Sequence, residues 1–381
     1  MLKNVIKSIF NKNTYINDKF YRLFSSEKTA HIDELNSIMN SWDTIKDVSM
    51  LKEFRKLVDK GELFYTTDPN YSNAHIYGIW ESLFGTIAES SYLNTPAVEH
   101  GLIFHNQIFT DLQYTARMTF ATFSPFRKNI IRQYSERPVF CVGPYIHYAD
   151  SFYEQLKLDA LKKKLGKTLL IFPTHSTDTS EISVKENLFC NKIAEIAKNY
   201  DTVIVNAFWW NINDILIDRL QSEGYHISSA GFRDDKKFLS RLKTIIMLSD
   251  YAVGDSVGTH IGYCLHLNVP FQMLQLDTKV NILTGKERDD LGFVEKHMQV
   301  IEGCLINGGT ITEKQRDICK RYWGFECVKT REELEDICVI TTDILKRCRG
   351  NSFLEKKVIA ELLKEYKNID IKKYIMLKNS I

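Results

Sequence analysis

One stretch of the chain, residues 250–271, constrains the fold more than any other. It starts with a short apolar segment at 251–253, which predicts a buried strand. Small and polar residues follow, and an apolar run at helical spacing then begins at Ile261. Pro270 ends that helix, and a further strand is predicted over 272–276. A strand, a turn and a helix in this order direct backbone N–H groups and the positive end of the helix dipole at one point.

The turn between this strand and this helix has the composition of an anion-binding site. Its glycines let a ligand approach the backbone, and its hydroxyls can donate hydrogen bonds, so a phosphate is the best candidate occupant. The glycine spacing matches neither the dinucleotide fingerprint nor a P-loop. An ordinary turn whose glycines only permit close packing is therefore the alternative. The candidate phosphate-binding residues are Asp255, Ser256, Gly258, Thr259 and His260.

The chain before this stretch alternates between strand-like and helix-like segments. An apolar run at 167–172 is typical of a strand buried in a parallel sheet. The alternation predicts a doubly wound parallel sheet in the second half of the chain. The further strands are predicted at 202–207 and 225–228, and the helices at 184–198, 211–223 and 235–249.

A second polar turn follows the strand at 167–172 and holds His175, Ser176 and Thr177. Neighbouring parallel strands place such turns side by side, so we expect both turns to address one phosphate group. His175 is then the candidate that donates a proton or a hydrogen bond to a leaving phosphate, although a lone histidine in such a turn is usually bonded locally. Arg233 is a further candidate for phosphate binding, unless the adjacent Asp234 and Asp235 neutralise its charge.

The first half of the chain predicts another α/β unit, with helices at 30–60 and 76–88. One of its strands ends in Glu99, His100 and Gly101. Ligands of open α/β sheets bind beyond the carboxyl ends of the strands, so Glu99 and His100 are candidate general bases. Successive side chains of a strand point to opposite faces, so only one of the two addresses the substrate. The alternative is a strand end with a solvated glutamate. The other strands are predicted at 62–66, 118–123 and 138–143, and a further helix from Pro125.

These patterns divide the chain of 381 residues into an N-terminal domain, residues 1–150, and a second domain, residues 151–345. C-terminal helices over residues 346–381 are expected to pack back on the body. A basic amphipathic helix is predicted at 1–13. It is expected to dock on its own domain, and contact with an anionic membrane surface is the alternative.

Composition narrows the class of protein. Hydrophobic residues make up 44% and charged residues 26% of the chain, as in globular enzymes, and a net charge of +2 gives no electrostatic case for nucleic-acid binding. The eight cysteines form no CxxC pair, which indicates buried free thiols such as that of Cys141, and a reducing cytoplasm. No apolar run approaches the 18 residues of a membrane span. We therefore expect a cytoplasmic protein that can also make peripheral contact with the inner membrane.

Four motifs give the chain a resemblance to bacterial glycosyltransferases of the two-domain GT-B type, which make surface polysaccharides or lipopolysaccharides. They are VEHGL at 98–102, VGPYIHYA at 142–149, FPTHSTD at 172–178 and DSVGTHIGY at 255–263. The resemblance implies two Rossmann-like domains that face each other across a cleft. The second would hold a nucleotide sugar, and the first a glycan or lipid-linked glycan acceptor. It also implies metal-independent chemistry, and the sequence has no Asp-x-Asp motif; no metal and no cofactor are expected.

What the resemblance implies for the reaction is a base in the acceptor domain, here Glu99 or His100, with an acid favoured. The donor is a nucleoside-diphosphate sugar or a CMP-linked acid sugar, and this stays open because the His-Pro pair of the CMP-dependent relatives is here His175-Ser176. Three other classes remain. They are a polyol-phosphate transferase of the teichoic-acid type, a non-hydrolysing nucleotide-sugar epimerase and a non-catalytic binding protein.

Overall fold

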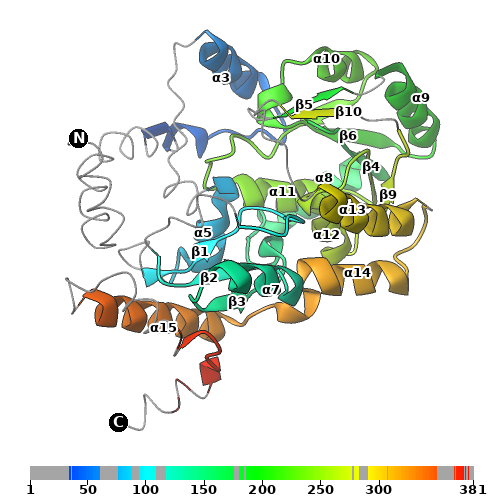
Figure 1. Cartoon of the computed structure of the whole chain (residues 1–381). Helices are drawn as coiled ribbons and strands as arrows, with labels where there is room; N and C mark the ends of the chain where they lie inside the picture. Colours follow the sequence, from blue (N-terminus) through cyan, green and yellow to red (C-terminus); the bar gives the residue numbers. More distant parts are fainter. Residues whose placement is uncertain are drawn as a thin grey trace, which may run out of the picture.

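A computed structural model shows how these segments are arranged in space (Figure 1). It has two parallel sheets, each with helices packed against it, so the predicted α/β class is confirmed. The residues that it describes are 34–35, 37–60, 76–87, 94–108, 117–175, 180–183, 186–276, 279–282, 291–306, 308–349, 364, 366–372, 374 and 376.

The larger sheet has five strands, all parallel, in the order β7-β6-β4-β8-β9. The first strand of this sheet along the chain is β4. Strands β6 and β7 follow on one side of it, and the chain then returns to form β8 and β9 on the other side. The order therefore reverses between β4 and β8, which is where ligands bind in folds of this kind. The strands are β4 (Thr168–Phe172), β6 (Thr202–Asn206), β7 (His226–Ser228), β8 (Tyr251–Gly254) and β9 (Phe271–Met273).

Helices cover both faces of this sheet, so its central strand β4 is buried on both sides. In β4, Leu169 and Ile171 face one core, whereas Leu170 and Phe172 face the other. All four side chains are buried, as the continuous apolar run predicted. The helices of this unit are α8 (Gln155–Leu165), α9 (Glu186–Ala197), α10 (Ile215–Ser222), α11 (Phe238–Met247) and α12 (Thr259–His266), and a short turn η4 (Trp209–Asn211) precedes α10.

The smaller sheet is also parallel, in the order β1-β2-β3. Its strands are short, and each was predicted within a few residues of its observed position. The helix predicted from Pro125 is confirmed, with the proline in its first turn. The predicted strand at 62–66 and the helix at 1–13 lie outside the described residues. The elements of this unit are β1 (Ala97–Val98), β2 (Phe120–Thr122), β3 (Val139–Cys141), α5 (Ile79–Phe84), α7 (Pro125–Tyr134) and two short turns, η1 (Ile76–Gly78) and η3 (Tyr145–His147).

The last third of the chain contains three helices and part of a two-stranded ribbon. Helix α13 and the antiparallel pair β5-β10 were not predicted. The ribbon's strands, SEIS and KVNI, are short and too polar to give a strand signal. The elements are β5 (Ser180–Ser183), β10 (Lys279–Ile282), α13 (Leu291–Leu305), α14 (Glu313–Trp323) and α15 (Arg331–Arg349).

Two segments pack on the sheet farther from them in sequence. Phe54 of α3 (Ser49–Asp59) contacts Trp209 and Phe232 beside the larger sheet, with ring centroids 6.2 and 5.2 Å away. At the other end of the chain, Thr341 of α15 shares a 2.7 Å hydrogen bond with Thr119, just before β2. Figure 1 shows α15, in orange, below the smaller sheet. The boundary expected at 345 thus falls inside a helix that contacts the first unit.

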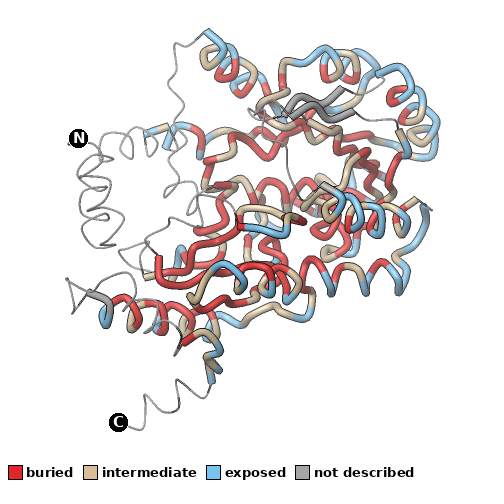
Figure 2. Tube along the Cα trace, viewed as in Figure 1, coloured by how far each residue is buried: buried red, intermediate tan, exposed pale blue. Residues whose placement is uncertain are grey.

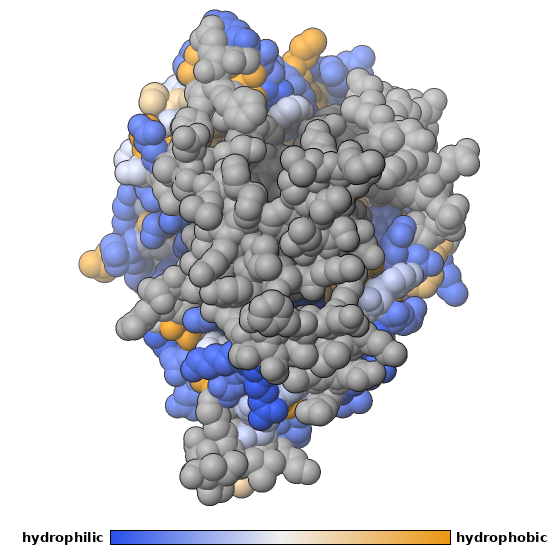
Figure 3. Space-filling model, turned by 60° about the vertical axis from the view of Figure 1, so that its left-hand side comes forward, coloured by the Kyte–Doolittle hydropathy of each residue, from blue (hydrophilic) through white to orange (hydrophobic). Residues whose placement is uncertain are grey.

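Burial follows this arrangement (Figure 2). Buried positions run along the strands and inner helix faces, and exposed positions lie on the outer faces of α9, α10 and α14. In the view of Figure 3, hydrophobic residues on the visible described surface are scattered among hydrophilic ones. None of the described helices is long and apolar enough to cross a bilayer.

A buried ion pair organises the carboxyl end of the smaller sheet. Nε of Arg127, on α7, donates to Oε1 of Glu99 at 2.7 Å, and the hydroxyl of Thr122 donates to Oε2 at 2.7 Å. The Glu99 side chain is 0% exposed. The same guanidinium donates to the backbone carbonyls of His105 and Gln107. Glu99 therefore fixes Arg127, and Arg127 fixes the loop that follows β1.

This geometry favours a structural role for Glu99, and its role as the general base stays a prediction. A carboxylate that accepts hydrogen bonds from two buried donors, one of them cationic, is part of a buried ion pair that is costly to break. We predict that Glu99→Gln lowers the free energy of unfolding by about 3–5 kcal/mol, the cost of removing one partner of a buried pair. Chemical denaturation measures it.

The matched control is Glu335→Gln, because Glu335 pairs with Arg331 on the surface of α15 at 3.1 Å. Such exposed pairs contribute about 0–1 kcal/mol. If Glu99→Gln unfolds like the control and yet abolishes activity, Glu99 has a chemical role after all.

Candidate functional site

A cavity of about 580 Å³ lies between the two sheets. The larger sheet contributes the residues that follow β4, β6 and β8 and the start of α12, and the smaller sheet contributes His100 and Gly101 after β1. Tyr77 and Ile79 line it from the first unit as well. Its volume is within the range of about 300–1,000 Å³ that is usual for ligand pockets. The expected cleft between two α/β units is therefore present, at the topological switch point.

The two polar turns lie side by side, as predicted. Strands β4 and β8 are direct neighbours, with Phe172 opposite Gly254. Beyond the strand ends, the backbone N–H of Thr174 donates to Oδ1 of Asp255 at 2.8 Å. This hydrogen bond joins the turn that contains His175 to the turn that contains Asp255, just before the N-terminus of α12.

Helix α12 begins at the cavity with its first N–H groups available. Gly258 occupies the N-cap position in an extended conformation, and no side chain caps the helix there. The first N–H groups of a helix have no intrahelical acceptor, and together with the dipole they favour an anion. Ser256, Gly258 and Thr259 all line the cavity at this point. An anionic group there would receive the hydrogen bonds that a capping side chain otherwise makes.

Four buried polar atoms around the cavity have no hydrogen-bond partner among the described residues: Thr174 Oγ1, Asn206 Oδ1, Asp255 Oδ2 and His260 Nε2. All four residues line the cavity, and they come from three neighbouring strand ends and from α12. Leaving a buried polar atom unpaired costs about 1–3 kcal/mol, so native proteins rarely do so without a reason. Their convergence on one space indicates a polar ligand.

The histidines of the cavity differ in their environments. Burial, with a further contribution from the neighbouring His175, lowers the pKa of His260 to about 3, so this imidazole is neutral at physiological pH. Its ring stacks on Phe172 with centroids 4.6 Å apart. His175 stacks on Phe208 at 4.0 Å. Neutral His260 can donate or accept one hydrogen bond at Nε2, depending on its tautomer.

Asp255 is the charged residue at the centre of the site. Burial raises the pKa of its carboxyl group, and the hydrogen bond from the Thr174 backbone N–H opposes this effect. One oxygen is held by the Thr174 backbone, while the other faces the cavity unpaired. A carboxylate in this state is a strong acceptor for a hydroxyl group of a ligand.

The remaining predicted site residues have different fates. His100 lines the cavity, whereas Glu99, the residue before it on β1, does not. This agrees with the expected alternation of side chains. Ser176 and Thr177 lie outside the described residues. Arg233 does not belong to the cavity wall formed by described residues, and its Nε lies 3.8 Å from the Asp234 carboxylate, so its expected role in phosphate binding stays a prediction.

One contact joins the two halves of the site directly. The backbone N–H of Leu102 donates to Oγ1 of Thr259 at 2.8 Å. A Cβ atom at Gly101 would lie 3.4 Å from the same oxygen, which is an ordinary van der Waals contact. The loop of His100 and the first residue of α12 therefore contact each other.

Sequence reasoning missed Thr174 and Asn206. Each follows or ends a predicted strand of the larger sheet, so the rule that ligands bind at carboxyl ends could have identified both. Tyr77 and Glu302, which also line the cavity, gave no such signal because they lie outside strand ends. Within the described part of the chain, no three His, Cys, Asp or Glu side chains gather as a metal site.

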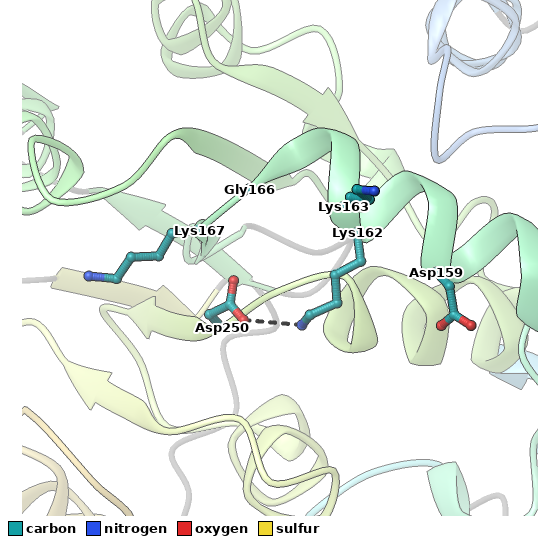
Figure 4. Close-up of a pocket in the computed structure, with 6 residues that line it drawn as sticks. All are labelled: Asp159, Lys162, Lys163, Gly166, Lys167 and Asp250. Carbon is teal, nitrogen blue, oxygen red and sulfur yellow. Dashed lines mark ion pairs between the residues drawn. The ribbon is translucent and has the colours of Figure 1, made fainter.

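A second cavity, of about 410 Å³, lies at the opposite, amino edge of the larger sheet (Figure 4). Lys162 and Lys163 lie in the last turn of α8, and Lys167 lies between this helix and β4. Nζ of Lys162 lies 3.2 Å from the Asp250 carboxylate and also donates to the carbonyl of Met247. Figure 4 shows Lys167 directed away from Asp250. The ion pair ties α8 to the start of β8, which is a structural role.

No family model and no curated sequence matches the chain. Among solved structures, the wall teichoic acid polymerase TagF is similar, with a TM-score of 0.33 and 13% identity over 61% of this chain. A UDP-GlcNAc 2-epimerase from Neisseria meningitidis, bound to UDP-GlcNAc, is similar with a TM-score of 0.31 and 13% identity over 62% of this chain. The chain covers 59% and 63% of those two solved chains, less than two thirds of either.

Proposed function

We propose that this protein is a GT-B-type glycosyltransferase that moves a sugar from a nucleotide-sugar donor to a hydroxyl group of a glycan or glycolipid. The observation that carries the proposal is the set of four unpaired polar atoms around the cavity, beside the uncapped start of α12. A nucleotide sugar carries the two kinds of hydrogen-bonding group that would pair with these atoms. Its phosphate accepts from helix N–H groups, and its sugar hydroxyls donate to unpaired oxygens.

The donor's phosphate is placed at Gly258 and Thr259, where α12 begins. No lysine or arginine belongs to the cavity wall formed by described residues. The stabilisation of charge on the leaving nucleotide therefore rests on backbone N–H groups, the helix dipole and hydrogen bonds from His175. The unpaired oxygens of Asp255 and Asn206 would accept bonds from sugar hydroxyls.

His100 is the base in this proposal. It lines the cavity from the acceptor side, and Glu99, the other candidate, is held in its ion pair with Arg127. A sugar hydroxyl is a weak nucleophile at neutral pH, so a positioned proton acceptor raises the rate of attack on the donor. Glu99 contributes indirectly, because through Arg127 it fixes the loop in which His100 lies.

A polyol-phosphate transferase of the teichoic-acid type is the second candidate. The specific observation in its favour is that His100 and Gly101 both line the cavity, so a histidine followed by a glycine faces the donor site. The donor phosphorus, rather than the sugar carbon, would then be attacked. A reaction with a nucleotide-linked polyol in place of a nucleotide sugar separates the two, and turnover without any acceptor identifies an epimerase instead.

We predict opposite effects for two threonines at the ends of β4. Thr174→Val removes an unpaired hydroxyl, so it leaves the ligand-free protein as stable as the parent or more so. It weakens donor binding by about 1 kcal/mol for a neutral hydrogen bond, or up to about 3 kcal/mol for a charged one. The measurement is thermal unfolding with and without a panel of nucleotide sugars.

Thr168→Val is the matched control, because the Thr168 hydroxyl donates to the Gly166 carbonyl at 3.0 Å, far from the cavity. It should lower the melting temperature of the free protein and leave nucleotide affinity unchanged. The same pattern in both variants would show that the cavity is not the donor site.

The variant His100→Asn tests the base. Transfer should slow by about 10²–10⁴-fold, the usual effect of removing a general base, while donor affinity stays within a few-fold of the parent. His226→Asn is the control, because His226 is exposed and bonds only the Ile45 carbonyl. Transfer by His100→Asn at the rate of the control would exclude His100 from the chemistry.

We also predict that transfer survives dialysis against EDTA. The proposed leaving-group stabilisation comes from α12 and His175, and the sequence has no Asp-x-Asp motif. Product formation by the dialysed enzyme, with and without added manganese, measures this. A strict requirement for the metal would contradict the role given to the start of α12.

A further inference from the structure

The segment between α14 and α15 contacts the end of β3 (Figure 1). A Cβ atom at Gly143 would lie 2.9 Å from the carbonyl oxygen of Gly324 and 3.1 Å from the nitrogen of Val328. The N–H of Lys329 also donates to the hydroxyl of Tyr148 at 2.8 Å. Residues of the first unit and the short turn η5 (Phe325–Cys327) are therefore packed backbone against backbone.

Two cysteines face each other at this junction. Cys141 is the last residue of β3 and Cys327 the last of η5, and their thiols are close enough for each to shift the pKa of the other. Both are free and only half-buried, so Cys141 is not the fully buried thiol expected from its apolar strand. Lys128 of α7 and Lys329 lie close enough to act electrostatically on both sulfurs, and Glu326 acts on Cys327.

The two thiols are not equivalent. The hydrogen bond between them, burial and the Cys327 charge raise the pKa of Cys141. The same hydrogen bond lowers the pKa of Cys327 to about 7, with help from Lys329 and Lys128 and against the effects of burial and Glu326. A thiolate is the nucleophilic form of cysteine, so Cys327 is the reactive member and Cys141 supplies the proton of the hydrogen bond.

We propose that Cys141 and Cys327 form a modification site, a dithiol that hydrogen peroxide oxidises to a disulfide. The Cys327 thiolate attacks one peroxide oxygen and breaks the O–O bond, which gives a sulfenic acid and hydroxide. The Cys141 thiol then attacks the sulfenic sulfur, the S–S bond forms, and the oxygen leaves as water. Two electrons pass from the two thiols to the peroxide, and one S–S bond results.

The disulfide would fasten the junction that leads to the cavity. Four residues before Cys327, the indole Nε1 of Trp323 donates to the carbonyl of Thr259 at 3.0 Å. Trp323 also packs against Gly262, where a Cβ atom would lie 2.2 Å from the indole ring. The start of α12 is therefore connected to η5 through one side chain, and a covalent bond at Cys327 restricts its movement.

The experiment treats the full-length protein with hydrogen peroxide and analyses digests by mass spectrometry without reduction. We expect a linked pair of peptides that contain Cys141 and Cys327 and that separate on reduction. The rate should rise about tenfold between pH 6 and pH 8, because the thiolate fraction of a group with a pKa of about 7 rises by that factor. Failure to form the link would overturn the proposal.

Two variants and a control sharpen the result. Cys141→Ser should leave Cys327 as a sulfenic acid that dimedone traps, whereas Cys327→Ser should leave Cys141 unoxidised. Cys304 is the control thiol, because it is also half-buried but donates to the Val300 carbonyl at 3.2 Å. Oxidation of Cys304 as fast as that of Cys327 would show that exposure alone determines the rate of oxidation, and would contradict the proposal. None of these residues belongs to the proposed transfer site, so the outcome is independent of that function.

Discussion

The parallel pairing of β4 with β8 is the constraint on which the site depends. Because the chain passes from β4 to β6 and β7 before it returns to β8, two strand ends from distant parts of the sequence become neighbours. The turns after these strands are therefore adjacent, and the hydrogen bond from Thr174 to Asp255 fixes their relative position. The uncapped start of α12 and the unpaired oxygens then face one space. The cavity is thus a consequence of strand order.

Buried polar groups serve two different purposes in this molecule. Both oxygens of the Glu99 carboxylate accept hydrogen bonds, and its partner Arg127 also donates to backbone carbonyls of the loop after β1. Around the cavity, by contrast, the acceptors of Asp255 and Asn206 are buried and left without partners in the described structure. The first arrangement favours stability, whereas the second costs stability and favours binding. That difference separates positioning residues from ligand-binding residues more clearly than residue type does.

The larger sheet could be predicted from the sequence because its signals are local. The apolar run of β4 and the strand, turn and helix around Asp255 each lie within about twenty residues, and the structure confirms both. The role of Glu99 could not be predicted, because its partner Arg127 is 28 positions away and on another element. The pairing of Cys141 with Cys327 and the packing of α15 on the smaller sheet are likewise non-local. Polar strands such as β5 lack the apolar pattern that periodicity detects.

The hydrogen bond from Leu102 to Thr259 would give the two substrates of the proposed transfer a common element. The loop that contains His100 is hydrogen-bonded to Thr259, where we propose that the donor's phosphate binds. A movement of the loop would therefore be coupled to a movement of Thr259. Two ligands that bias the same element have linked affinities, and the linkage is equal in both directions. The acceptor's dissociation constant would then depend on whether a donor is bound, and the donor's on the acceptor. In the proposed reaction, the affinities of the two substrates would thus be coupled through a single threonine hydroxyl.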